Sequence, residues 1–93
     1  MYKIVYHESV VRDLKKITKA DREKIRKAIE KKLMLNPLLF GEPLRSSLVG
    51  YRKLRVGEYR IVYHVMDDNT LIVIIIAHRR NVYDFVKKRV SGV

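Results

Sequence analysis

Ninety-three residues carrying 21 Lys or Arg against 10 Asp or Glu give this chain a formal net charge of +11 at neutral pH. It has no cysteine, and its three histidines lack a metal-ligand spacing, so we expect neither a metal nor another cofactor. The longest apolar run, LIVIIIA, is far shorter than the roughly 20 residues of a membrane helix, so we expect a soluble, cytoplasmic protein without a membrane partner.

Length and charge together indicate the size of the fold and the class of partner. A chain this short has room for one hydrophobic core, so residues 1–93 are predicted to form a single domain. The positive charge exceeds what solubility requires and favours encounter with polyanions. Composition therefore points to nucleic acid as the leading partner. The alternative is that the positive charge only keeps the protein soluble.

The first third of the chain predicts one strand and two helices. Residues 2–6 alternate and are rich in strand-forming residues, and Ser9 is a plausible N-cap for the first helix. Thr18 resembles the start of a capping box for the second helix, which runs until Asn36-Pro37 stops it. The apolar stripes of the two helices are Val10, Leu14 and Ile17, then Ile25, Ala28, Ile29 and Leu33.

The rest of the chain predicts a connection, three strands and a final helix. Residues 38–49 contain Gly, Pro and a Ser pair, so we expect an irregular connection. Its Leu38, Leu39, Phe40 and Leu44 are predicted to close one end of the core. Strands are predicted over residues 51–56, 59–65 and 71–77, the last buried on both faces. The helix begins at Arg80 or Asn81, ends at Ser91-Gly92, and has an inward stripe of Val82, Phe85, Val86 and Val90.

The element order is therefore β-α-α-β-β-β-α. Two consecutive helices followed by meandering strands imply an α+β domain. We expect the two N-terminal helices to pack on one face of a twisted, mostly antiparallel four-stranded sheet.

The stretch GYRKLRVGEYRIVYH, residues 50–64, predicts a hairpin with Gly57-Glu58 as its two-residue turn. Antiparallel pairing then places Arg55 opposite Arg60, and such a like-charge pair typically costs a few tenths to about 1 kcal/mol. Because side chains alternate along strands, the hairpin has two faces. Leu54, Val56, Tyr59, Ile61 and Tyr63 face the core beneath the helices, and Tyr51, Lys53, Arg55, Arg60, Val62 and His64 form an opposite, polar face.

The second turn, residues 67–70, leaves the neighbour of Arg60 open. A two-residue turn at Asp68-Asn69 places Ala77 opposite Arg60, whereas a loop shifted by one residue places His78 there. In the first case the polar face continues through Val73, Ile75 and Ala77 toward Arg79. Either register puts a cationic or titratable side chain beside Arg60.

Arginine and lysine interleaved with tyrosine and histidine on a sheet face suit a phosphodiester. Guanidinium groups contact phosphate oxygens, and aromatic rings stack on unpaired bases. Cleavage of RNA needs little more, because the 2′-hydroxyl is a built-in nucleophile. The protein must remove its proton, stabilise the charge on phosphorus and protonate the leaving oxygen. The alternative is a passive surface that binds RNA or protein without catalysis.

The residues GYRKLRVGEYRIVYHV, followed by a turn, LIVIIIAHRRNVY and a short basic helix, resemble the RelE/ParE superfamily of bacterial and archaeal toxins. Length, basicity and element order match over nearly the whole chain. The resemblance implies one of two activities. RelE-like members are metal-independent, ribosome-dependent mRNA endonucleases, whereas ParE-like members inhibit DNA gyrase without being enzymes.

At matching positions, the RelE-like branch implies that the catalytic residues are Lys53, Arg60, Arg79 and Tyr83. In that branch the cations orient and stabilise the phosphate, and the tyrosine assists proton transfer or stacks on a base. Further RNA contacts are expected from Tyr51, Arg55, His78 and Arg80. Two features depart from the pattern: Tyr51 stands where some RelE enzymes have a second Lys, and the segment from Arg79 to Tyr83 is shorter than in some members.

The resemblance also implies the partners. The chain is expected to be a type II toxin that cleaves translated mRNA in the ribosomal A site through attack by the 2′-hydroxyl, with ParE-like gyrase inhibition as the alternative. A cognate, RelB-like antitoxin would wrap the domain and cover the basic face or displace the last helix. Residues 12–32 hold ten Lys or Arg against four Asp or Glu. These basic helix faces are expected to contact ribosomal RNA, with a solvated surface as the alternative.

Overall fold

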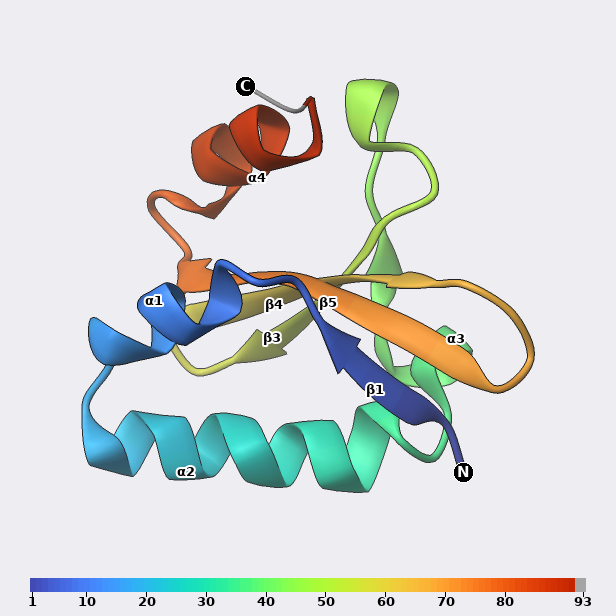
Figure 1. The fold of residues 1–93 in the computed structure, drawn as a ribbon, viewed down its shortest axis with the longest axis horizontal. Helices are drawn as coiled ribbons and strands as arrows, with labels where there is room; N and C mark the ends of the chain where they lie inside the picture. The colour runs from blue at the N-terminus through green and yellow to red at the C-terminus, as the bar shows by residue number, and fades with distance from the viewer. Residues whose placement is uncertain (92–93) are drawn as a thin grey trace.

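A computed structural model describes residues 1–91 and shows helices on both sides of a twisted sheet (Figure 1). None of the helices within those residues combines the length and the apolarity needed to cross a membrane. In chain order the elements are β1 (Lys3–Tyr6), α1 (Val10–Lys15), α2 (Lys19–Ala28), a π-helical turn (Ile29–Leu33), α3 (Pro37–Phe40), β2 (Glu42–Pro43), a 3-10 turn (Ser46–Leu48), β3 (Arg52–Val56), β4 (Tyr59–Val65), β5 (Thr70–His78) and α4 (Val82–Val90).

The sheet confirms the α+β class but has five strands where four were expected. Its order is β1-β5-β4-β3-β2, with β1 parallel to β5 and all other pairs antiparallel. The additional strand, β2, is two residues long and pairs Glu42 with Lys53 and Pro43 with Arg52. A strand this short shows no alternating pattern, and its proline indicates a loop, so sequence reasoning missed it.

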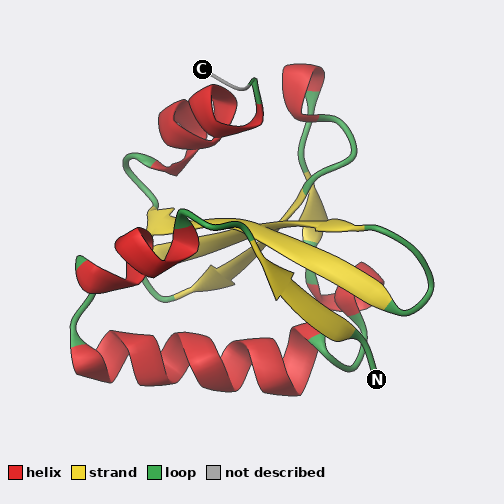
Figure 2. Ribbon diagram, in the orientation of Figure 1, coloured by secondary structure: helices red, strands yellow, loops and turns green. Residues whose placement is uncertain are grey.

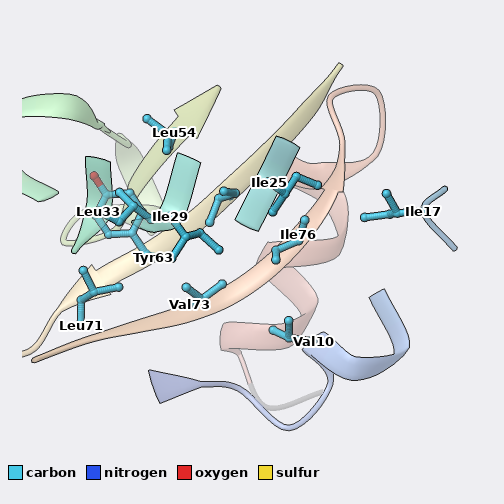
Figure 3. Packing of buried hydrophobic residues seen from close by; sticks show 11 residues of the cluster. Val10, Ile17, Ile25, Ile29, Leu33, Leu54, Tyr63, Leu71, Val73 and Ile76 are labelled. Carbon is cyan, nitrogen blue, oxygen red and sulfur yellow. The ribbon is translucent and has the colours of Figure 1, made fainter. Parts of the chain in front are cut away.

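Each face of the sheet carries its own apolar cluster. Helices α1 and α2 cover one face, where Leu33, Tyr63 and Leu71 are completely buried (Figure 3). Helix α4 lies on the opposite side of the sheet, and its Val82 and Val86 are completely buried there (Figure 2). The predicted helix hairpin on one face is therefore confirmed, and α4 covers only part of the other.

Ser9 and Thr18 were both expected to cap helices, but only Thr18 does so. The Thr18 side chain accepts a hydrogen bond from the Asp21 amide at 3.3 Å, which confirms the cap of α2. Ser9 stands at the start of α1, yet its hydroxyl caps no helix amide and instead accepts a hydrogen bond from Arg12. At the other end of the chain, α4 ends before Ser91, and Gly92 of the expected Ser91-Gly92 end lies outside the described residues.

Two groups of residues expected in the core are exposed. Leu38, Leu39 and Phe40 were predicted to close one end of the core, but their exposed fractions are 56%, 69% and 44%. The short helix α3 turns Pro37 inward instead, and the buried Tyr63 hydroxyl donates a hydrogen bond to the Pro37 carbonyl. Phe85 is also exposed, because Val82, Val86 and Val90 already form the inward line of α4 at four-residue spacing.

The hairpin registers set the position of the polar face. Arg55 pairs with Arg60, as predicted, and Arg60 pairs with Ala77. The second turn, however, is not the predicted two-residue turn, because next to it Val65 pairs with Leu71, one position out of the predicted register. A bulge between Val62 and Tyr63 then shifts the pairing by one residue, so Arg60 still lies opposite Ala77. The bulge also reverses the alternation, so Val73 lies in the cluster beneath the helices and was wrongly assigned to the polar face.

Candidate active site

An open hollow of about 410 Å³ lies on the sheet face opposite α1 and α2. It is lined by Glu42, Lys53, Arg55, Arg60, Arg79, Arg80 and Tyr83. All four residues expected to be catalytic line this hollow, together with two of the four expected RNA contacts. Strands β3 and β4 supply three of the cations, and the segment from the end of β5 to the first turn of α4 supplies the rest.

Arg60 is the one buried residue in the lining of the hollow and is held by the turn beside it. Its side chain is only 7% exposed, and its Nη1 donates hydrogen bonds to the carbonyls of Gly57 at 3.0 Å and Tyr59 at 2.9 Å. Gly57 adopts a φ of +58°, which suits glycine in a two-residue hairpin turn. The guanidinium is therefore fixed in place before any ligand arrives, a feature that the strand pattern alone does not reveal.

Arg79 and Tyr83 reach the hollow from the chain that follows β5. The Arg79 amide donates to the Glu58 carbonyl at 2.8 Å, and its Nε lies 2.9 Å from Glu58 Oε2. Lys53 Nζ donates a hydrogen bond to the Tyr83 hydroxyl at 2.9 Å and lies 5.4 Å from the centre of its ring. Of the two open alternatives, Arg79 rather than His78 shares the hollow with Arg60.

Two of the predicted RNA contacts lie elsewhere. His78 packs edge-on against Tyr59, with ring centres 5.7 Å apart, and lines a separate hollow between α1 and α4. The Tyr51 ring lies 5.6 Å from that of His64 and packs against the apolar cluster beneath α4. Neither side chain lines the cationic hollow.

Two carboxylates near the hollow were missed by the sequence reasoning. Glu42 lines it from β2, directly opposite Lys53, and was overlooked because β2 itself was not predicted. Glu58 stands in the predicted turn and pairs with Arg79. An acidic residue inside an otherwise cationic hairpin was a usable signal for Glu58.

The electrostatics of the hollow favour an anion. Five cations share its lining with one carboxylate, and within residues 1–91 the pair of Arg79 with Glu58 is the only ion pair made by those cations. Like charges this close repel, and a phosphate bound between them relieves the repulsion while accepting charge-assisted hydrogen bonds. Residues 1–91 contain no cluster of three or more side chains suited to hold a metal ion.

Comparisons with known proteins identify the family of this chain. The family model described as "ParE toxin of type II toxin-antitoxin system, parDE" matches residues 4–83. Toxin RelE of Mycobacterium tuberculosis is 30% identical over 80 residues, which cover 86% of this chain and 82% of that protein. Toxin RelG of the same organism is 40% identical over 52 residues, 55% of this chain and 60% of that protein.

A solved structure extends the comparison to the fold. The crystal structure of the toxin-antitoxin complex RelBE2 from Mycobacterium tuberculosis contains a chain similar to this one, with a TM-score of 0.77 and 30% sequence identity. The match covers 84% of this chain and 98% of that chain. On the family match over most of its length and on this similarity of fold, the chain belongs to the RelE/ParE superfamily of type II toxin-antitoxin toxins.

Proposed function

We propose that this toxin is a ribosome-dependent endoribonuclease that cleaves translated mRNA in the hollow opposite α1 and α2. The observation that carries the proposal is the meeting of Lys53, Arg60, Arg79 and Tyr83 in one hollow, although they come from three separate parts of the chain. This is the set that the RelE-like branch implies. The relatives named RelE and RelG support the same branch.

The chemistry follows from what each side chain can do. The 2′-oxygen of the substrate attacks phosphorus and forms a new P–O bond while the bond to the 5′-oxygen breaks, which leaves a 2′,3′-cyclic phosphate and a 5′-hydroxyl. Arg60 and Arg79 stabilise the negative charge that builds up on the phosphate oxygens. Arg60 needs little rearrangement to do so, because the turn carbonyls already hold its guanidinium.

Proton transfer involves the other side of the hollow. The Glu42 carboxylate can accept the proton of the 2′-hydroxyl, and the bonded pair of Lys53 and Tyr83 can deliver a proton to the leaving 5′-oxygen. Tyr83 is also exposed enough to stack on a base. Arg55, on the rim beside Arg60, holds the neighbouring phosphate.

The partners follow from surface charge and from the relatives. The toxin would act in the cytoplasm on mRNA in the ribosomal A site, with the basic faces of α1 and α2 against ribosomal RNA. A RelB-like antitoxin is the expected inhibitor, since a similar structure is a toxin-antitoxin complex. Its acidic or amphipathic segment would cover the cationic hollow or displace α4.

A second function, inhibition of DNA gyrase without catalysis, has one observation in its favour. The family model that matches residues 4–83 is named for ParE. Such an inhibitor has no need of five cations and a tyrosine around one hollow, so we rank it second.

Induced expression in bacteria, with mapping of mRNA 5′ ends, separates the two functions. The proposal predicts new 5′ ends within codons of translated messages, and their loss when translation is blocked. Arg60→Ala should remove these ends while the protein stays folded. Intact mRNA together with gyrase-linked DNA damage would refute the nuclease and favour the second function.

A further inference from the structure

One short turn contacts two arginines of the cationic hollow. The carbonyls of Gly57 and Tyr59 accept hydrogen bonds from Arg60, and Glu58, between them, holds Arg79. Glu58 does so twice: its carbonyl accepts from the Arg79 amide, and its carboxylate lies 2.9 Å from Arg79 Nε. The turn therefore sets the spacing between two guanidinium groups, one from β4 and one from the segment that follows β5.

We propose that Glu58 is a positioning residue that orients Arg79 toward the scissile phosphate. This inference rests on the proposed nuclease function. A guanidinium carries five N–H donors, and the Glu58 carboxylate lies against its Nε side as an ion pair. The two Nη groups make no hydrogen bond to residues 1–91 and remain available for a phosphate. Glu58 thus aligns the arginine without competing for the groups that bind substrate.

The exposure of this pair separates a positioning role from a structural one. The side chains of Arg79 and Glu58 are 53% and 63% exposed, and ion pairs at such sites add little to folding stability. An arginine whose side chain is free to rotate would nevertheless lose the alignment on which the rate depends. A change at Glu58 should therefore leave the fold intact and still slow the reaction.

The charge of Glu58 gives its variant a distinctive kinetic signature. A carboxylate beside the hollow repels the RNA phosphates, so its removal should leave substrate binding unchanged or tighter. Its removal should also loosen Arg79 and slow the chemical step. We expect Glu58→Gln to lower the cleavage rate at saturation about three- to fivefold, the range of an exposed ion pair. The toxin concentration at half-saturation should not rise.

Single-turnover cleavage of mRNA on programmed ribosomes tests this with a double-mutant cycle. Wild type, Glu58→Gln, Arg79→Ala and the double variant are compared, and Asp68→Asn, in the other hairpin turn, is the charge-matched control. If Glu58 acts through Arg79, its effect disappears in the Arg79→Ala background, and Asp68→Asn cleaves at the wild-type rate. A loss that persists without Arg79, or faster cleavage by Glu58→Gln, would overturn the inference.

A measurement that needs no ribosome follows the contact itself. Because the Glu58 carboxylate lies 2.9 Å from Arg79 Nε, the NMR signal of the Nε–H should be shifted from that of a free arginine in the wild type and should return to the free position in Glu58→Gln. The signal of Arg55, which makes no ion pair within residues 1–91, should stay unchanged. If Arg79 shows no change either, the positioning contact is absent.

The cleavage results separate the role of Glu58 from the nuclease function on which it depends. Wild-type protein that leaves ribosome-bound mRNA intact would refute the nuclease function, and the catalytic role of Glu58 would fall with it. Wild-type protein that cleaves, beside a Glu58→Gln variant that cleaves equally fast, would refute only the role of Glu58.

Discussion

The two faces of the sheet have different roles. Beneath α1 and α2 the sheet presents a continuous apolar surface, with Ile61, Tyr63, Leu71 and Val73 fully buried. On the opposite face, α4 covers one region, and the rest carries the cationic hollow. One face therefore supplies most of the stability, and the other keeps like charges close together, which costs stability and favours an anion.

The difference explains how a small domain tolerates Arg55 opposite Arg60. A fully buried aliphatic side chain contributes about 1.5–3 kcal/mol, whereas a like-charge cross-strand pair costs about 1 kcal/mol or less. The apolar face can therefore offset the cost of the cationic one. Changes on the two faces should have opposite signatures: loss of stability on the first, and loss of activity with little change in stability on the second.

The largest effect on stability is expected beneath the helices. Leu33→Ala removes a completely buried side chain and should lower the free energy of unfolding by about 3 kcal/mol. Leu39→Ala deletes the same atoms from a side chain that is 69% exposed, so it should change the free energy of unfolding by less than about 0.5 kcal/mol. Denaturant unfolding measures both. Equal effects would contradict the assignment of the core.

The next effect concerns the contact that holds α4 to the rest of the domain. Asp13 of α1 accepts two hydrogen bonds from Arg89 of α4, at 2.7 and 3.0 Å, and one from the Ile76 amide. Both side chains are mostly buried, with exposed fractions of 10% and 19%. Asp13→Asn should therefore lower the free energy of unfolding by about 2 kcal/mol, between the values for surface and buried pairs.

Asp84→Asn is the control for Asp13, because it removes an exposed carboxylate from α4 itself. In denaturant unfolding, the free energy of unfolding of Asp84→Asn should be close to that of the wild type. If Asp13→Asn were equally mild, α4 would be held by its apolar contacts alone.

A smaller effect links stability to pH on the helix-covered face. Burial raises the pKa of Tyr63, and nearby Arg52 opposes part of that rise. The native state thus keeps the phenol proton where the unfolded chain loses it, so this stabilisation is complete below about pH 10 and is lost as pH rises further. Tyr63→Phe should be less stable at neutral pH but lose less stability between about pH 9 and 11. Urea unfolding across that pH range measures both proteins, and an equal loss of stability in the wild type and in Tyr63→Phe would contradict the role of the Tyr63 proton.

The smallest effect is expected in the hollow and has the opposite sign. Arg55→Ala removes the cross-strand repulsion with Arg60 and should leave stability unchanged or raise it by about 0.5 kcal/mol, with a smaller gain at high salt. Arg45→Ala removes the same charge from an exposed position outside the hollow and should show no such gain. Thermal unfolding at two salt concentrations compares them, and a clear loss of stability in Arg55→Ala would argue against the repulsion.

Much of the fold could be predicted because periodicity reports which face is buried. The stripe that ends at Leu33 and the alternation around Leu54 and Ile61 both follow the period of their elements. The bulge could not be predicted, because a two-residue turn and a longer loop with a compensating bulge give the same partner for Arg60. The pairing with Ala77 was thus right, although the turn assumed for it was wrong.

The site was partly predictable for a similar reason. Lys53, Arg55 and Arg60 alternate with core residues, so their shared face follows from strand geometry. Glu42 could not be placed, because a two-residue strand shows no periodicity. The burial of Arg60 was also hidden, because it depends on hydrogen bonds to the turn rather than on any pattern of residue types.

Cleavage of a chemically defined mRNA on programmed ribosomes tests whether the cationic hollow is a nuclease site. One message is all ribose, and a second carries a single 2′-deoxy nucleotide at the cut site mapped in the first. We expect the all-ribose message to be cut in the A-site codon to give a 2′,3′-cyclic phosphate and a 5′-hydroxyl, and the deoxy message to survive. Cleavage of both messages, or of neither, would contradict this expectation.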